Sequence, residues 1–279
     1  MNYFYIITNE EKDKNLEITN RIKSYIENHG KVCAISKRDN QNRLLYHHIP
    51  TEVECALVLG GDGTLIRAAR ELAEFDIPLL GINMGTLGYL TEVEIEECEG
   101  ALDRLFADDF HIEERMMLRG KVHGQLEDTA LNDVVVTRDG YLRTIHFHVY
   151  VNEVLLHKYS ADGMIISTPT GSTGYNLSAG GPIVQPTASI ILLTPICPHD
   201  LNGSSIVLSP EDSIAIQIVG EENRQIPAVV TFDGVELIPL KIGERVTVRK
   251  SSQVTKIIKL SKESFMHTLR NKMKGNEVQ

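Results

Sequence analysis

The chain has 279 residues, of which 42% are hydrophobic and 24% charged, a composition typical of a folded protein with room for two domains. Its formal net charge of −10 argues against a general nucleic-acid or anionic-membrane surface. No apolar run approaches the ~20 residues of a membrane span, and the first residues lack the basic start of a secretion signal. We therefore expect no nucleic-acid partner, no membrane anchor and no secretion.

The four cysteines are scattered along the chain and form no C-x-x-C pair. This usage favours a reduced, cytoplasmic protein and predicts neither a disulfide framework nor a zinc site.

The first part of the chain, residues 1–112, alternates short apolar runs with amphipathic segments, which predicts a Rossmann-like parallel α/β domain. The expected strands are Tyr3–Ile7, Val32–Ile35, Ala56–Leu59 and Pro78–Ile82, and the expected helices cover about Leu16–Ile26, the segment after Thr64, and Ile95–Phe106. In such a sheet, ligands bind at the carboxyl ends of the strands.

After Arg115 the pattern changes to short alternating segments without room for helices, which predicts an all-β, sandwich-like domain over residues 113–255. The expected strands are Leu118–Val122, Ala130–Val136, Ile145–Val151, Glu153–His157, Met164–Ser167, Ile190–Leu193, Ser205–Leu208, Ser213–Val219, Ala228–Phe232 and Arg245–Lys250. Residues 256–279 are expected to return toward the α/β domain, with a helix over Ser264–Lys274.

Three glycines surround one carboxylate in Gly60-Gly61-Asp62-Gly63-Thr64, between a buried strand and an amphipathic helix. Glycine lets phosphate approach the backbone N–H groups, and the helix N-terminus that follows favours an anion. A single acid inside an anion-binding turn suggests that it handles a hydroxyl or a metal beside the phosphate. The structural alternative is that Asp62 only caps the helix.

A second motif, Asp162 to Pro182, combines hydroxyls, glycines and the aromatic Tyr175. Hydroxyls and backbone N–H groups suit phosphate and ribose, and an aromatic ring can pack against a base. The alternative is a turn that caps a short helix at Thr173 or Ser178.

A third motif, Asn132-Asp133, lies beside a predicted strand. Asparagine presents both a donor and an acceptor, which suits an adenine edge or a sugar diol. The alternative is an ordinary Asx turn.

These motifs, with Asn83-Met84-Gly85-Thr86-Leu87-Gly88 between them, occur in the order seen in NAD kinases, and the sequence resembles that family over about Ala56–Pro182. The glycine turn alone is shared with 6-phosphofructokinases and with diacylglycerol and sphingosine kinases. Its combination with Thr168-Pro169-Thr170-Gly171-Ser172-Thr173 is what points to NAD kinases.

The resemblance implies transfer of the ATP γ-phosphoryl group to the 2′-hydroxyl of the adenosine ribose of NAD, giving NADP and ADP. It also implies a divalent cation, expected to be Mg²⁺, with no metal ligand assigned in the chain, and a homodimer or homotetramer whose β domains pack together. It makes Asp62 the catalytic residue. The positions that it places against the nucleotides are Asp62, Gly63, Arg67, Asn132, Asp133, Arg143, Asp162, Thr173, Gly174, Tyr175, Asn176, Leu177 and Ser178.

Three positions depart from the family pattern: Gly174 where many relatives have Ala, Ser160 near a site that is often basic, and Val235 where Gln is frequent. Two alternative functions are compatible with the glycine turn. A lipid kinase with the same glycine turn would need an apolar acceptor groove or a membrane-facing basic patch, and a non-catalytic NAD(P)-binding regulator would be supported by loss of the central acid. The sequence leaves open NAD or NADH as acceptor, ATP or polyphosphate as donor, and Asp62 as base, orienting group or metal ligand.

Overall fold

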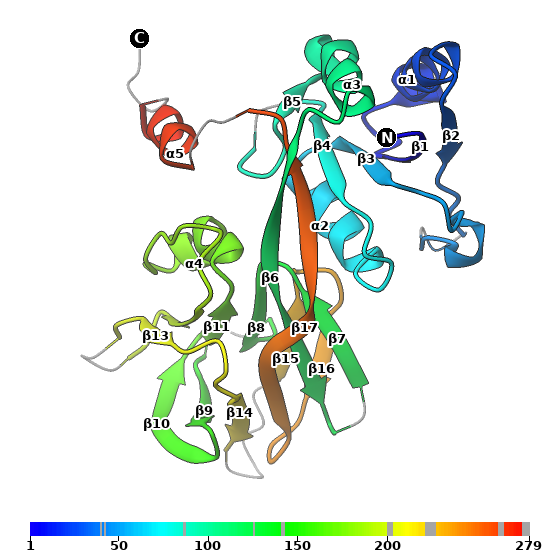
Figure 1. The fold of residues 1–279 in the computed structure, drawn as a ribbon. Coiled ribbons are helices and arrows are strands. Elements are labelled where there is room, and N and C mark those ends of the chain that lie inside the picture. The colour runs from blue at the N-terminus through cyan, green and yellow to red at the C-terminus, as the bar shows by residue number, and fades with distance from the viewer. Residues whose placement is uncertain are drawn as a thin grey trace. The chain divides into compact units, whose positions relative to one another are not determined.

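A computed structural model describes residues 1–39, 41, 43–85, 88–124, 126–140, 143–199, 203–220, 227–261 and 265–274. The chain divides into two compact units, whose elements are labelled in Figure 1. Unit 1 consists of Met1–Glu114 and Thr255–Gln279, and unit 2 of Arg115–Val254. The chain passes from one unit to the other within strands β6 (His111–Val122) and β17 (Arg245–Lys259).

Unit 1 is built on a parallel sheet in the order β2–β1–β3–β4, followed by the C-terminal part of β17. The strands are β1 (Tyr3–Thr8), β2 (Val32–Ile35), β3 (Cys55–Gly60) and β4 (Leu79–Asn83), and the short β5 (Val93–Glu94) also pairs with β4. Every residue of β3 is buried, as an unbroken apolar run between two helical layers requires. The predicted parallel α/β fold is confirmed.

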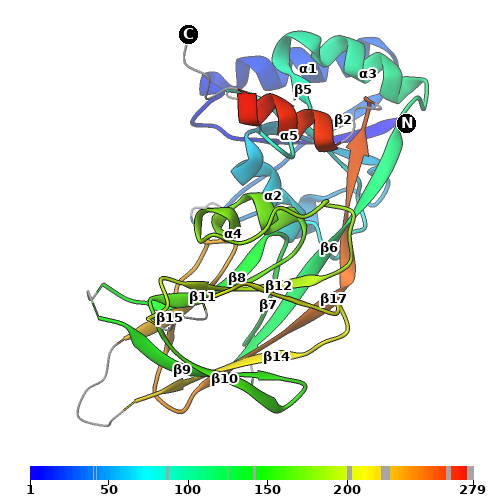
Figure 2. The ribbon, with the colours of Figure 1, turned by 90° about the vertical axis from the view of Figure 1, so that its left-hand side faces the viewer.

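Helices cover both faces of this sheet. Leu57 and Leu59 of β3 share one core with α1 (Glu17–Asn28) and α3 (Cys98–Phe106), and these two helices lie side by side in Figure 2. Side chains alternate between the faces of a strand, and a Cβ at Gly81 of β4 would lie 2.5 Å from Leu65 of α2 (Asp62–Glu71). Helix α2 therefore packs on the opposite face from α1 and α3.

Short 3-10 turns and one further helix complete unit 1: η1 (Lys14–Leu16), η2 (Tyr46–His48), η3 (Ile95–Glu97) and α5 (Phe265–Lys274). The C-terminal helix was predicted correctly, although Ser264, its expected first residue, lies outside the described residues. None of the helices in the described part of the chain is long and apolar enough to cross a membrane.

Unit 2 contains two layers of antiparallel strands. One layer contains β10 (Val154–Ala161), β9 (Ile145–Val151), β14 (Ile214–Val219), β17, β6 and β7 (Leu126–Ala130). The other runs β13 (Ile206–Leu208), β12 (Ile191–Ile196), β11 (Gly163–Ser167), β8 (Asp133–Arg138), β15 (Ala228–Phe232) and β16 (Ile238–Leu240). Side chains from both layers, among them Phe147 and Phe232, form one apolar core. The predicted sandwich-like fold is confirmed.

Several strand predictions in unit 2 were wrong in detail. Strand β6 begins at His111 rather than Leu118, β10 ends at Ala161 rather than His157, and β16 was not predicted. The single strand expected over Ala130–Val136 is two strands, β7 and β8, which are separated by Leu131 and Asn132. The last strand does not end at Lys250 but continues to Lys259.

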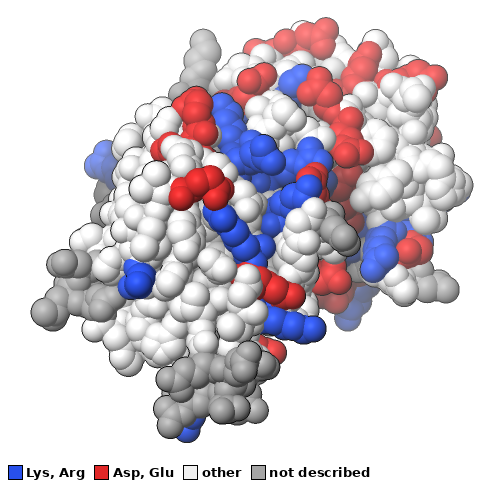
Figure 3. All heavy atoms as spheres, turned by 90° about the horizontal axis from the view of Figure 1, so that it is seen from below, with Lys and Arg blue, Asp and Glu red and all other residues white. Residues whose placement is uncertain are grey.

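Charged side chains are unevenly distributed on the surface. Figure 3 shows Lys and Arg side chains gathered on the face drawn there, with Asp and Glu side chains around them, although the formal net charge of the chain is −10. A negative net charge is therefore compatible with local positive surface for an anionic ligand.

Candidate functional site: a glycine turn in unit 1 and a braced polar turn in unit 2

The glycine turn joins β3 directly to α2. Gly61 is the N-cap of α2 in an extended conformation, so the helix begins at Asp62 rather than after Thr64 as predicted. A Cβ at Gly60 would lie 2.3 Å from the Thr64 hydroxyl, whereas a Cβ at Gly63 would meet nothing within 4 Å. The first position must therefore be glycine for packing, and the last leaves open space at a helix N-terminus, where an anion is favoured.

The Asp62 carboxylate is held by the loop that follows β4. One oxygen accepts the backbone N–H of Tyr89 at 2.7 Å, and the other accepts those of Leu90 and Thr91 at 3.1 and 3.2 Å and lies 3.3 Å from the Thr91 hydroxyl. Among the described residues, Asp62 makes no capping bond to its own helix, so the helix-cap alternative is wrong. The carboxylate instead has a fixed orientation, which a group that must meet a substrate hydroxyl requires.

The position of the Asp62 carboxylate requires glycine at position 88. A Cβ at this position would lie 1.7 Å from Asp62 Oδ1, so the carboxylate would have to leave the backbone N–H groups that hold it. Glycine at position 88 is therefore what allows the carboxylate to reach the backbone of the loop.

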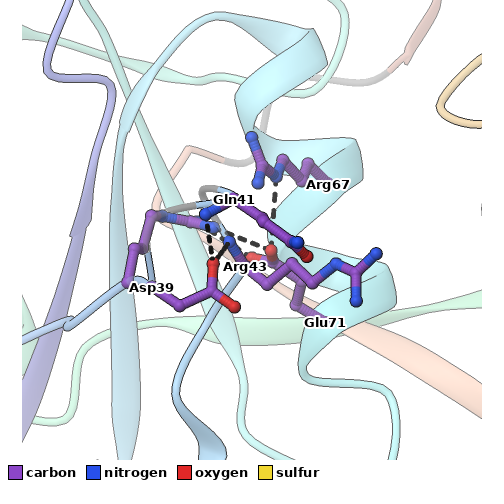
Figure 4. A network of polar contacts seen from close by, with 6 residues as sticks. Asp39, Gln41, Arg43, Arg67 and Glu71 are labelled. Atoms are coloured by element: carbon purple, nitrogen blue, oxygen red, sulfur yellow. Dashed lines mark hydrogen bonds and ion pairs between the residues drawn. The ribbon is translucent and has the colours of Figure 1, made fainter.

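Arg67 lies on α2, one turn before Glu71. Its Nε is 3.2 Å from Glu71 Oε1, and Arg38 holds the same carboxylate through two bonds of 2.8 and 2.9 Å. Figure 4 shows Arg67 and Glu71 beside a loop closed by Asp39, whose carboxylate accepts the backbone N–H groups of Gln41 and Arg43. These bonds, that from Arg43 first, lower the pKa of Asp39. Arg67, whose side chain is 36% exposed, is thus held in place by Glu71.

In unit 2, the Asn132-Asp133 turn is braced by a residue 100 positions further along the chain. The Asp233 carboxylate accepts the backbone N–H groups of Leu131, Asn132 and Asp133 at 2.8, 2.8 and 3.1 Å. On the other side, the Thr168 hydroxyl donates to the Leu131 carbonyl at 2.6 Å, and the Thr168 N–H donates to the Asn132 carbonyl. The described contacts include no Asx bond from Asn132 or Asp133, so the Asx-turn alternative is wrong.

This bracing leaves two polar side chains for a ligand. The Asn132 Oδ1 is buried and has no hydrogen-bond partner among the described residues, and a buried acceptor of this kind is costly unless a donor reaches it. Asp133 is 6% exposed. Burial, and then the charge of Asp233, raise the pKa of Asp133 to about 7. Near neutral pH its carboxyl group can therefore both donate and accept a hydrogen bond.

The hydroxyl-rich segment folds into η4 (Thr170–Thr173) and α4 (Tyr175–Ser178). Gly174 is the N-cap of α4, and neither short helix has a side-chain cap, so the capping alternative for Thr173 or Ser178 is wrong. Most of its polar groups hold the segment itself: the Ser172 hydroxyl bonds both backbone groups of Val184. The Thr170 hydroxyl, in contrast, is buried without a partner among the described residues.

Asn176 holds the segment rather than presenting its amide to solvent. The side chain is fully buried, donates to the carbonyls of Ser172 and Pro182, and accepts the Thr194 hydroxyl at 2.7 Å. A ligand at this segment would therefore meet the Asn176 backbone. The neighbours Tyr175 and Leu177 are exposed, at 46% and 39%.

The remaining predicted residues of unit 2 lie in different surroundings. Asp162 forms a two-point ion pair with Arg138, at 2.9 and 3.3 Å. Burial, and then the charges of Cys197, Asp162 and Asp133, raise the pKa of Tyr175. Gly174 lies next to Asn132, since its Cβ would be 3.6 Å from Nδ2. Arg143 is exposed, and no described contact joins it to this group.

Two residues of unit 2, Arg138 and Asp233, were not predicted from the sequence as part of the site. The available signal for Asp233 is the Asp233-Gly234 pair, because an Asp-Gly pair directly after a strand indicates a turn. Asp233 and Gly234 both have positive φ, 50° and 70°. The turn after β15 therefore directs the Asp233 carboxylate back to the Asn132-Asp133 backbone.

A fixed carboxylate in a glycine turn at a helix N-terminus, and a hydroxyl-rich turn beside a buried acid, are features of a nucleotide-dependent phosphotransferase. Comparisons with known proteins agree with this class. Residues 5–110 match the family described as ATP-NAD kinase N-terminal domain, and residues 131–260 match the ATP-NAD kinase C-terminal domain. The chain belongs to the NAD kinase family.

A relative from Lachnospira eligens named NAD kinase is 44% identical, with 98% of this chain and 100% of the relative covered. The fold is similar to that of a yeast NADH kinase solved with NADH, with a TM-score of 0.83 at 21% identity over 100% of this chain and 89% of the yeast chain. It is also similar to that of an NAD kinase from Archaeoglobus fulgidus solved with ATP, with a TM-score of 0.78 at 24% identity over 98% of each chain.

Proposed function

We propose that this chain transfers the γ-phosphoryl group of ATP to the 2′-hydroxyl of the adenosine ribose of NAD. The observation that carries the proposal is the Asp62 carboxylate, fixed by backbone N–H groups inside a glycine turn. Family membership supports it, as do the relative named NAD kinase and the structural neighbour solved with ATP.

In this proposal the turn in unit 1 carries the chemistry. Phosphoryl transfer depends mainly on positioning and on charge stabilisation through a loose transition state. Asp62 orients the acceptor hydroxyl and accepts its proton late in the transfer. Gly63 and the N-terminus of α2 offer N–H groups to phosphate, and Arg67, held by Glu71, adds positive charge near it.

Unit 2 supplies the contacts to the dinucleotide. Asn132 and Asp133 bind the adenosine part, which gives the unpaired Asn132 oxygen a donor. The segment Thr173-Gly174-Tyr175-Asn176-Leu177-Ser178 lines the bound molecule, through the Tyr175 ring and, at Asn176, through the backbone. Asp162, paired with Arg138, and the exposed Arg143 complete the proposed set.

The divalent cation fits as part of the substrate. Within the described parts of the chain, no group of three His, Cys, Asp or Glu side chains could hold a metal ion. Mg²⁺ is commonly held by substrate phosphates with few protein carboxylates. We therefore propose Mg²⁺–ATP as the form that binds.

Two further expectations remain proposals. The exposed apolar side chains of Val154, Leu155 and Leu156 on β10 support association of β domains in a homodimer or homotetramer. The four cysteines are free thiols, which supports a reducing compartment such as the cytoplasm.

The experiment mixes the purified chain with ATP, Mg²⁺ and NAD and measures NADP through an NADP-specific dehydrogenase that generates fluorescent NADPH. Formation of NADP that requires all three components is the expected result. A signal that appears without ATP would reveal contamination. Binding of NAD without any NADP would overturn the kinase proposal in favour of a regulator, and phosphorylation of diacylglycerol or sphingosine instead of NAD would favour a lipid kinase.

A further inference from the structure

Lys12 lies in the turn after β1, and its ammonium group is beside the glycine turns of unit 1. A Cβ built on Gly85 would lie 3.2 Å from Lys12 Nζ, and one built on Gly61 would lie 3.7 Å from it. Gly61 precedes Asp62, and Gly85 follows β4. The ammonium group is therefore adjacent to the backbone of both glycine-containing turns.

The order of the sheet explains this position. Strand β3 pairs with β1 on one side and with β4 on the other, and all are parallel. The turns that follow them, Asn9–Asp13, Gly60–Thr64 and Met84–Gly85, consequently begin at the same edge. This is the edge at which parallel α/β sheets bind their ligands.

The turn that carries Lys12 is tied to the glycine turn. The Asn9 carbonyl accepts the N–H groups of Lys12 and Asp13, both at 3.0 Å, and the Asn9 N–H donates to Leu59 at the end of β3. The Asn9 amide also donates to the Thr64 hydroxyl at 3.4 Å. The Lys12 backbone is thus fixed relative to the start of α2.

Asp13 anchors the other end of the turn to α1. Its buried carboxylate accepts the N–H groups of Ile18 and Thr19 at 3.0 and 2.8 Å and the Thr19 hydroxyl at 2.6 Å. Burial raises the pKa of Asp13, but the bonds from Thr19 and Ile18 together lower it below its ordinary value. Asp13 is therefore committed to α1 and does not neutralise its neighbour Lys12.

The Lys12 side chain is exposed, and the described contacts include no hydrogen bond or ion pair to its ammonium group. The nearby Asp62 carboxylate faces the loop at Tyr89–Thr91. Glycine at positions 61 and 85 leaves backbone without side chains around the ammonium group. A lysine beside exposed peptide groups at a helix N-terminus is suited to phosphate, which it binds as a point charge.

We propose that Lys12 binds a phosphoryl group of the nucleotide held at the glycine turn, an inference that rests on the proposed function. The phosphate belongs either to the polyphosphate chain of the donor or to the pyrophosphate of NAD, and the two sources are separated by which substrate loses affinity. In either case Lys12 adds a contact to substrate that neither Gly63 nor Arg67 provides.

The test compares Lys12→Met, which keeps the length of the side chain and removes its charge, with Lys12→Arg and with the control Lys14→Met. Lys14 is an exposed basic residue of the same segment, at the start of η1. Steady-state kinetics give KM for ATP and for NAD, and calorimetry gives the Kd of Mg²⁺–ATP and of NAD. The expected result for Lys12→Met is a rise in KM and Kd for one substrate of roughly 10-fold or more, as for the loss of a charged hydrogen bond. Lys12→Arg should recover part of the loss, and Lys14→Met should match the wild type.

A rise in KM and Kd for ATP assigns Lys12 to the phosphates of the donor. A rise in KM and Kd for NAD assigns it to the pyrophosphate of NAD. KM and Kd values for both substrates within twofold of the wild type would overturn the proposal. If the wild-type chain forms no NADP, the proposed function fails, whereas the calorimetric comparison still decides whether Lys12 binds phosphate.

Gly85→Ala provides a test that does not remove the charge. The added methyl group would lie 3.2 Å from the ammonium group, which would have to shift by a few tenths of an ångström. The substitution should therefore weaken binding of the same substrate in the wild-type background and have a smaller effect on binding in the Lys12→Met background. Equal effects in both backgrounds would contradict the contact.

Discussion

Asp62 and Asp233 organise their surroundings in the same way, in different units of the chain. Each carboxylate accepts N–H groups from three consecutive residues, Tyr89–Thr91 for Asp62 and Leu131–Asp133 for Asp233. Hydrogen bonds to ionised groups are stronger than those between neutral groups. A carboxylate bound to three amides therefore fixes the path of a loop as well as its own position.

Asp62→Asn is expected to lower kcat by about 10²–10⁴-fold, the usual contribution of a general base. The amide of asparagine would also direct N–H donors at backbone N–H groups, so the free energy of unfolding should fall by about 1–3 kcal/mol. The measurements are kcat and urea unfolding, with the exposed Glu74→Gln as control. An unchanged kcat in a folded variant would exclude Asp62 from the chemistry.

Asn132→Ala should raise KM for NAD by about 2–10-fold and change KM for ATP less, because one hydrogen bond to a neutral group is lost. The turn itself should survive, since Asp233 and Thr168 hold its backbone. Asn176→Ala is the contrasting variant: its amide binds protein groups, so it should lower stability. Equal effects of Asn132→Ala on both substrates would argue against a role in binding NAD.

Asp133 should make stability depend on pH in an unusual direction. Its pKa is raised from 3.8 to about 7, so between about pH 4 and 7 the folded state binds more protons than the unfolded state. The contribution of this residue to stability is therefore fully present at low pH and is lost as the pH rises to about 7. Urea unfolding gives the free energy of unfolding at pH 5 and at pH 8. The difference between these two values should be smaller for Asp133→Asn than for the wild type or for the exposed Asp139→Asn. The same difference in all three proteins would contradict the prediction.

At the scale of elements, regular sequence patterns predicted the bounds of several strands well. Features that depend on long-range contacts were not predicted. Strands β2, β9 and β15 have the bounds that alternation and apolar runs predict. The break between β7 and β8 was not predicted, because the local sequence of Ala130–Val136 is typical of one continuous strand. The break is set by Asp233, about 100 residues away in sequence, and no local periodicity reports such a contact.

Gly88→Ala tests the loop after β4 without removing the Asp62 charge. The new Cβ would lie 1.7 Å from Asp62 Oδ1, so the carboxylate or the loop must move, and we expect loss of most turnover together with a lower melting temperature. Gly100→Ala is the matched control. Its Cβ would meet nothing within 4 Å in α3, and alanine should stabilise a helix interior by about 0.5–1 kcal/mol. Full activity of Gly88→Ala would show that the position of the carboxylate is not critical.

At the scale of the whole molecule, unit 1 is assembled from both ends of the chain. Its sheet includes the C-terminal part of β17, and Lys272 of α5 lies over the ring of Tyr89, 4.7 Å from its centre. An N-terminal fragment would lack this strand segment and this helix, next to the loop that holds Asp62. The function is therefore best tested on the intact chain.

The sequence was most informative where a motif is contiguous. The glycine turn, Asn132-Asp133 and the hydroxyl-rich segment were identified as binding candidates from their residues and from the resemblance to NAD kinases, and the family is now confirmed. The supporting residues Arg138, Asp233 and Lys12 were not identified, because each acts on residues distant in sequence and is an ordinary charged side chain on its own.

The most direct test of the central claim is the position of the phosphate in the product. The intact chain is incubated with ATP, Mg²⁺ and NAD, and the purified product is examined by phosphorus NMR beside authentic NADP and its 3′-phosphate isomer. We predict a single new monoester resonance that coincides with that of the 2′-phosphate. A 3′-phosphate, or no phosphorylated dinucleotide from a folded chain that binds both substrates, would contradict the account.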